Sequence, residues 1–286
     1  MGYVPVTRLD GVSVFRKAAM GTWRTAKDPQ VYSIMEIDVT DIIPMMDEYT
    51  KKHGVKITFS HVVGKALTYI LQRRPEINGF LRGSRIWLRR DVRLNYLVNV
   101  PGEGDEKVKK ATLSTCSIPE CEKKTVAQIA QELVKRAGAV RRNEDADIRK
   151  NMSMWKYIPW WMMKFYLSLA SWLIYGLNIN LPGIPKDPFG SVMITNVGAL
   201  GIGPTWAPLV PYSRVPLLIT LCAVTKKAWV VDDRIEIRHI LPVCITYDHR
   251  FMDGAQAAQM FADFTECFRR PADLLFNDGD ETGTKD

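Results

Sequence analysis

The sequence predicts one α/β domain built around a mixed sheet. Helical and strand patterns alternate through the first half, and strand patterns dominate from Ser191 onward. The chain shows no internal repeat and no long linker, and 286 residues can bury a large core. Apolar residues make up 47% of the chain and charged residues 24%, which are ordinary globular values that exclude wholesale disorder.

Periodicity and helix-ending residues define the elements of the first half. The helical pattern over 11–27 stops before Pro29, and residues 31–40 alternate apolar and polar side chains as a strand does. Gly54 and Pro75 end the two helices that follow. The remaining elements expected here are helices at 41–54, 60–74 and 125–142, strands at 85–90 and 92–100, and a Gly- and Lys-rich loop at 101–110.

The second half opens with an apolar segment and continues as a run of strands. Residues 151–187 are crowded with Trp, Met and Leu, and no formal charge occurs from Phe165 to Pro185. We therefore expect an apolar helical insertion within a domain that spans 1–275. The expected strands are 191–198, 216–226, 227–233 and 234–249, followed by a final helix at 254–269 and a flexible acidic tail at 276–286.

The net charge of +8 is spread along the chain and is not gathered in one cluster. No aromatic–basic module or zinc finger accompanies it, so nucleic acid is not the expected partner. An anionic small ligand, an acidic protein or an acidic lipid surface explains the charge better. The five cysteines lack ligand-like spacing, and no signal peptide opens the chain; we expect buried reduced thiols, no metal site and a cytoplasmic protein.

The stretch YDHRFMDG, residues 247–254, places a histidine where a strand pattern gives way to a helix. Such a junction can aim a side chain into a cleft, and the pKa of histidine suits proton transfer near neutrality. Taken alone, a histidine at a strand end is more often a satisfied polar residue. The GxSxG, GxxxxGK and GxGxxG motifs are absent, which leaves His249 the role of a general base on a thiol or hydroxyl that the substrate supplies.

Five ordered segments carry a family resemblance. They are FRKAAMGTW, MEIDVT, ITFSHVVGKALTYILQRRPEINGF, SVMITNVGALGI and YDHRFMDG, the last followed by RRPADLL. In order and spacing they resemble the acyltransferase core of 2-oxoacid dehydrogenase complexes, which shares its His-x-x-x-Asp-Gly element with chloramphenicol acetyltransferase. The match covers most of residues 8–275 and leaves out 151–187. It implies a chloramphenicol acetyltransferase-like two-layer sandwich with a mixed sheet.

The resemblance implies roles for two side chains in acyl transfer. His249 matches the base that takes the proton from the thiol of coenzyme A. A thiol with a pKa of about 8.5 is mostly protonated at neutral pH, and the thiolate is the nucleophile. Thr195 matches the hydroxyl that stabilises the oxyanion formed on the thioester carbonyl.

The resemblance also implies residues that support the site. Asp253 matches a structural carboxylate that pairs with an arginine of the opening helix, and Arg16 is the matching position. Asn196 follows the oxyanion-stabilising threonine, and Gly254 lets the chain turn into the last helix.

The implied assembly is a homotrimer that can join into larger shells. Its active site lies at the subunit boundary, with the histidine of one chain facing the hydroxyl of its neighbour.

Coenzyme A is the implied substrate, with no metal and no lipoyl attachment site in this chain, so a lipoyl group is expected on a separate protein. The family's GLxxPVI-like segment is replaced by residues 100–117, which leaves the acyl acceptor open. A catalytically inactive trimeric scaffold is the alternative.

Two roles are left open for the apolar segment at 157–180. A single membrane span would separate two parts of one domain, so topology argues against it. The segment either packs against another subunit or partner, or lays its apolar face on a membrane surface beside the basic stretch VKRAGAVRRN.

Overall fold

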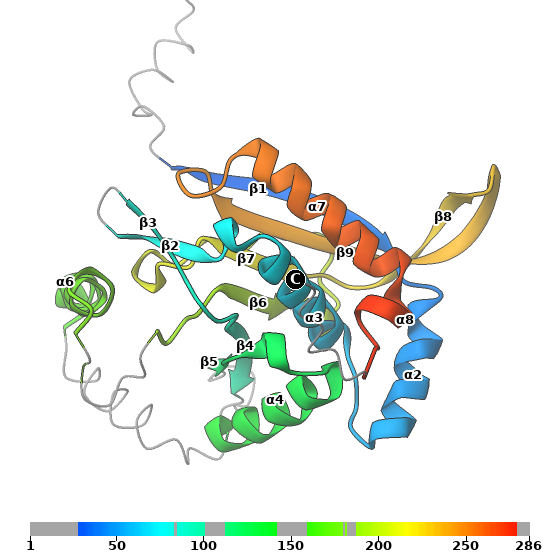
Figure 1. Ribbon diagram of the computed structural model, residues 1–286, viewed down its shortest axis with the longest axis horizontal. Helices are drawn as coiled ribbons and strands as arrows, with labels where there is room; N and C mark the ends of the chain where they lie inside the picture. The colour runs from blue at the N-terminus through cyan, green and yellow to red at the C-terminus, as the bar shows by residue number, and fades with distance from the viewer. Residues whose placement is uncertain are drawn as a thin grey trace, which may run out of the picture.

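A mixed sheet forms the centre of the protein (Figure 1). The computed structural model describes residues 28–82, 85–100, 112–141, 159–179, 181 and 187–278. In these residues the sheet has seven strands in the order β1-β9-β7-β6-β4-β5, with β8 paired to β9, and β2 and β3 form a separate hairpin. The strands are β1 (Gln30–Asp38), β2 (Gly79–Arg82), β3 (Arg85–Leu88), β4 (Leu94–Val100), β5 (Thr112–Ile118), β6 (Val192–Asn196), β7 (Leu217–Leu221), β8 (Thr225–Val231) and β9 (Arg234–Asp248).

Three helices, α3, α4 and α7, cover one face of this sheet (Figure 1). The described helices are α2 (Ile42–His53), α3 (Phe59–Arg73), α4 (Val126–Arg141), α6 (Trp160–Ser171), α7 (Gly254–Arg269) and α8 (Pro271–Leu274). A π-helical turn, η4 (Trp172–Gly176), continues α6. Short 3-10 turns lie at η1 (Pro75–Ile77), η3 (Cys121–Lys123), η5 (Gly198–Leu200) and η6 (Pro211–Ser213).

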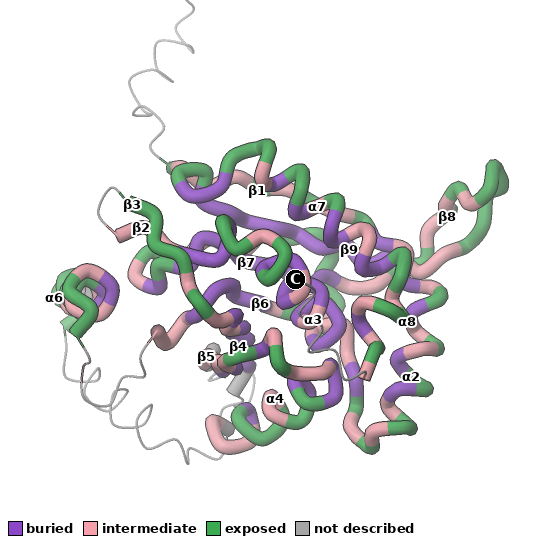
Figure 2. The backbone as a smooth tube through the Cα atoms, in the orientation of Figure 1, coloured by how far each residue is buried: buried purple, intermediate pink, exposed green. Residues whose placement is uncertain are grey.

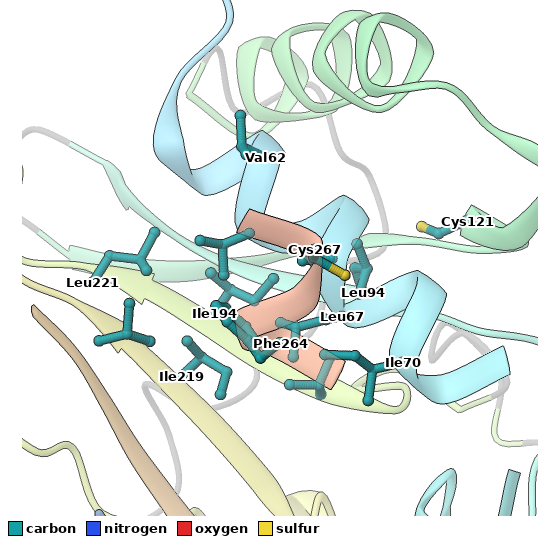
Figure 3. Close-up of a cluster of buried hydrophobic side chains, with 14 of the residues drawn as sticks. Val62, Leu67, Ile70, Leu94, Cys121, Ile194, Ile219, Leu221, Phe264 and Cys267 are labelled. Carbon is teal, nitrogen blue, oxygen red and sulfur yellow. The ribbon is translucent and has the colours of Figure 1, made fainter. Parts of the chain in front are cut away.

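The main core lies between the sheet and these helices (Figure 3). Leu67 of α3 and Phe264 of α7 are fully buried against Ile194 of β6 and Ile219 of β7. Successive side chains of a strand point to opposite faces, so Thr195 and its neighbour Thr220 point to the other face. A smaller cluster around Met193, Val215 and Leu218 packs on that face.

The expected mixed α/β fold is confirmed, and so are the late strands and the last long helix. The expected helix within 151–187 is present as α6 and η4. All five cysteines are buried, as expected. The hairpin strand β2 and the strand β5 were not predicted from the sequence.

The expectation of a tail that is flexible from residue 276 is wrong for its first residues. Phe276 packs on the ring of Tyr49, with centroids 5.2 Å apart. The carboxylate of Asp278 accepts from Tyr49 Oη, from Lys52 Nζ at 2.7 Å and from His53 Nε2 at 2.9 Å. These contacts hold the chain against α2 as far as residue 278, and residues 279–286 lie outside the described residues.

Within the described ranges, no helix combines the length and the apolar character needed to cross a membrane.

Candidate active site

The first half of the candidate site is the turn after β9, called here the histidine half. The carbonyl of Asp248 accepts from the backbone N–H groups of Phe251 (2.9 Å) and Met252 (3.0 Å). Phe251 and Met252 are buried, and His249 N donates to Pro29 O at 2.9 Å. The turn is therefore fixed at both ends while the His249 side chain is exposed to solvent. Among the described residues, no side chain hydrogen-bonds to its ring.

Asp248 is a supporting residue that sequence reasoning missed. Its Oδ1 accepts from Arg250 N at 2.9 Å and from Arg250 Nε at 3.0 Å, and its Oδ2 accepts from Arg250 Nη2 at 2.6 Å. Asp248 is buried, so these bonds satisfy a carboxylate that would otherwise lack partners. The pair fixes the turn on either side of His249.

Asp253 caps helix α7. Gln256 N donates to Asp253 Oδ1 at 2.9 Å, and Asp253 N donates to Gln256 Oε1 at 3.1 Å, which is a reciprocal capping box. The spacing Asp-x-x-Gln in the sequence was the signal that could have revealed this role. Arg16, the expected ion-pair partner of Asp253, lies outside the described residues.

The structure does not support the turning role that the resemblance gave to Gly254. The positive-φ glycines of the described chain are Gly54, Gly190 and Gly201. An added Cβ at Gly254 meets nothing within 4 Å, so neither sterics nor backbone conformation requires a glycine at the start of α7.

The second half of the site is the end of β6, called here the threonine half. Thr195 is half-buried on the face opposite α3. The next residue, Asn196, donates from Nδ2 to Ser60 Oγ at 3.0 Å, and its Oδ1 accepts from Ala199 N at 3.1 Å. Asn196 thereby ties the end of β6 to the first turn of α3 and to the loop that follows.

Two neighbours complete the threonine half. Gly198 lies so close to β7 that an added Cβ would be 2.3 Å from Cys222 O, so only glycine fits there. Thr220 lies beside Thr195 in the parallel β6–β7 pair and is 1% exposed. Its hydroxyl has no hydrogen-bond partner among the described residues, which makes it an unsatisfied donor next to Thr195.

The two halves lie far apart within one chain. Thr195 is level with Thr220 of β7, and Thr220 is level with Cys244 of β9. His249 follows Cys244 by five residues, a distance of about 17 Å along the strand at about 3.3 Å per residue. Two strand spacings add about 10 Å, so Thr195 and His249 of one chain are roughly 19 Å apart. One chain cannot bring both side chains to a single carbonyl group.

Exposed apolar side chains lie on the loop after β6, next to the threonine half, and on β1, the edge strand beside β9. The loop reaches β1, where Trp206 Nε1 donates to Ser33 O at 2.8 Å. A monomer in water rarely exposes so many large apolar groups together. The exposed residues are Tyr32, Ile34, Leu200, Ile202 and Trp206.

No metal cluster marks the site: the described residues contain no group of three or more His, Cys, Asp or Glu side chains placed to hold an ion. A surface pocket of about 460 Å³ is lined by residues of α4 alone and belongs to neither half.

His61 lies in the first turn of α3, next to Ser60. It is 5% exposed, and Thr58 N donates to its Nδ1 at 3.1 Å in a capping box. It therefore caps the start of α3 from a buried position. Burial lowers the pKa of His61 from 6.5 to about 4.

The depressed pKa of His61 predicts a loss of stability in acid. Between pH 6.5 and about 4 the unfolded chain binds a proton that the folded chain does not, so stability falls as pH falls. The loss due to this group is about 3 kcal/mol. His61→Gln keeps a capping side chain but does not titrate. We expect urea unfolding at pH 7 and at pH 4.5 to show a smaller acid loss in this variant; equal losses in both proteins would contradict the prediction.

Comparison with known families identifies what this chain is similar to. The family described as 2-oxoacid dehydrogenases acyltransferase (catalytic domain) matches residues 10–147 and 189–276. The match passes over 148–188, the stretch that contains α6 and η4.

Curated relatives and a solved structure agree with this family. The chain is 23% identical over 281 residues to the dihydrolipoyllysine-residue acetyltransferase component of pyruvate dehydrogenase complex from Acholeplasma laidlawii, covering 96% of this chain and 42% of the relative. It is 23% identical over 245 residues to the dihydrolipoyllysine-residue succinyltransferase component of 2-oxoglutarate dehydrogenase complex from Staphylococcus epidermidis. This match covers 84% of this chain and 47% of the relative. The chain thus spans less than half the length of these relatives.

The solved structure is a dihydrolipoamide acetyltransferase from Azotobacter vinelandii, studied for the roles of a serine, a histidine and an asparagine in its catalytic mechanism. It superimposes with a TM-score of 0.62 at 18% identity, covering 96% of this chain and 100% of the other. This likeness shows a common fold.

Proposed function

This chain belongs to the acyltransferase catalytic-domain family of the 2-oxoacid dehydrogenases, and from that premise we propose that it transfers an acyl group between coenzyme A and a dihydrolipoyl-like thiol. The observation that carries the proposal is that the histidine half and the threonine half are each held in place by hydrogen bonds. A fixed turn presents an exposed histidine, and a braced strand end presents a hydroxyl beside a second, unsatisfied one.

The proposed reaction needs one base and one oxyanion donor. His249 takes the proton from the thiol of coenzyme A, and the sulfur attacks the carbonyl carbon of the acyl thioester. The carbon–sulfur bond forms as the carbonyl oxygen becomes negative, and the Thr195 hydroxyl donates to that oxygen. Collapse of the intermediate breaks the other carbon–sulfur bond, and the leaving thiolate takes the proton back from the histidinium. No bond to the enzyme forms at any stage.

The Azotobacter vinelandii enzyme supports these assignments by analogy. The histidine and asparagine studied there are four residues apart. In this chain Asp253 stands four residues after His249, so a carboxylate occupies the place of that amide. In this proposal Thr195 takes the part of the serine studied there.

We further propose that the active site forms between two chains of a homotrimer. His249 and Thr195 of one chain are roughly 19 Å apart across the sheet, too far for one thioester. A neighbour packed on the exposed apolar residues of the loop after β6 would bring its His249 to the threonine half. The trimer is then required for activity as well as for stability.

A thiol exchange assay tests the proposed function. Purified protein is mixed with dihydrolipoamide and either acetyl-CoA or succinyl-CoA, the acyl groups of the two relatives' reactions, and S-acyl dihydrolipoamide is measured by mass spectrometry. Enzyme-dependent product with at least one acyl group is expected. An assembled trimer that forms no product with either would support the inactive-scaffold alternative and contradict the proposal.

A further inference from the structure

The α6–η4 segment, which the family match passes over, is held firmly against the rest of the chain. Tyr175 Oη donates to Asp187 Oδ1 at 3.0 Å. Arg89 donates to the same carboxylate from Nε (2.7 Å) and Nη2 (3.1 Å), and the Tyr175 ring lies 5.3 Å from the ring of Phe80. The segment therefore has a defined orientation relative to the β2–β3 hairpin beside it (Figure 1).

The outward side of α6 is apolar and uncovered. Met162, Phe165, Leu169 and Trp172 follow one another at spacings of three, four and three residues, which puts them on one side of a helix. All four are exposed, and Phe165 is 68% exposed. Figure 2 shows exposed stretches along α6. Exposed large apolar groups in such a row mark a binding surface.

The hairpin beside α6 adds an aromatic ring and positive charge. Its register pairs Phe80 with Trp87 and Arg82 with Arg85, so these four side chains share one face. That face is the one whose Phe80 contacts Tyr175. The guanidinium of Arg82 lies 4.9 Å from the Trp87 ring, and in the described ranges no carboxylate pairs with Arg82 or Arg85.

The apolar row on α6 and the arginines of the hairpin together indicate what binds to this surface. We propose that this surface, formed by Met162, Phe165, Leu169 and Trp172 together with Arg82, Arg85 and Trp87, docks the protein on an anionic lipid surface. The apolar side chains enter the interfacial layer, where tryptophan is favoured, and the arginines meet acidic headgroups. A second copy in a two-fold contact would set these arginines against their own equivalents, which disfavours self-association here.

The length of the helix agrees with a position on the membrane surface. The 12 residues of α6 and the 5 residues of η4 are together about 25 Å long, short of the hydrocarbon core of about 30 Å. This docking does not use His249 or Thr195, so it is independent of the proposed catalysis.

Vesicle binding tests the proposal. The protein is sedimented with vesicles of equal parts phosphatidylglycerol and phosphatidylcholine, and with vesicles of phosphatidylcholine alone. Strong binding to the anionic vesicles is expected. The double variant Phe165→Ser/Leu169→Ser should bind them at least about tenfold more weakly, and Arg85→Glu about tenfold more weakly. The matched control is Ile237→Ser on β9, where the isoleucine is 76% exposed and lies outside this surface; it should bind as wild type does.

Three outcomes would overturn the proposal. The wild-type protein could fail to bind anionic vesicles, or the double variant could bind them as well as wild type. The double variant could also lower the oligomer mass in analytical ultracentrifugation while vesicle binding stays unchanged, which would assign the surface to a second copy. Thiol exchange activity is measured alongside, and we expect it to be unchanged in the double variant.

Discussion

Replacement of His249 by alanine is expected to lower turnover in thiol exchange by about 10²–10⁴-fold. Without the imidazole, the attacking thiol, which is dihydrolipoamide in this assay, must lose its proton to water, and most of it is protonated near neutral pH. The side chain is exposed, and in the described chain nothing hydrogen-bonds to its ring, so the melting temperature and oligomer mass should be unchanged.

His53 provides the matched control for this variant. It is a half-buried histidine whose Nε2 contacts Asp278 at 2.9 Å, remote in the sequence from both halves of the site. His53→Ala should keep wild-type turnover. If His249→Ala also keeps near wild-type turnover, His249 is not the base.

Replacement of Thr195 by alanine is expected to lower turnover by about 10²–10³-fold while acyl-CoA binding is kept. The hydroxyl acts on the oxyanion, which exists only during the reaction. Thr195→Ser retains the hydroxyl and should restore most of the turnover. Kinetics give turnover, and isothermal titration calorimetry gives the affinity for acyl-CoA.

The variant Asp253→Ala distinguishes a residue that supports the fold of the site from one that takes part in the reaction. It removes the α7 cap and should cost about 1 kcal/mol of stability. If Thr195→Ala instead loses stability to the same extent as Asp253→Ala, or if the serine variant is as inactive as the alanine variant, the oxyanion role is wrong.

The fold was predictable where local pattern and tertiary environment agree. The strand β7 and the second part of β9, from Ile240 to Tyr247, are largely apolar runs because both of their faces are covered, and α3 has a cap, an apolar stripe and a following proline. The strand β5 escaped prediction because its sequence, TLSTCSI, is rich in hydroxyl groups and becomes a strand by pairing with β4. The hairpin strand β2 has four residues, too few for a periodic signal.

The candidate site was predictable only in part. The resemblance singled out His249 and Thr195, and in the structure each belongs to a segment that hydrogen bonds hold in place. The contact of Asn196 with Ser60 joins residues 136 positions apart, and the neighbour Thr220 depends on strand order. No short-range pattern encodes either contact. The roughly 19 Å separation within one chain likewise follows from the sheet register.

The measurement that tests the central claim most directly mixes two inactive variants. His249→Ala chains and Thr195→Ala chains are purified separately, unfolded together in equal amounts and refolded, and thiol exchange is measured. If each site takes its histidine from one chain and its threonine from the next, random assembly gives both side chains in one site of four, and about a quarter of wild-type turnover returns. If the mixture is no more active than the two variants measured separately, each site is built within one chain, and the account of a shared active site is contradicted.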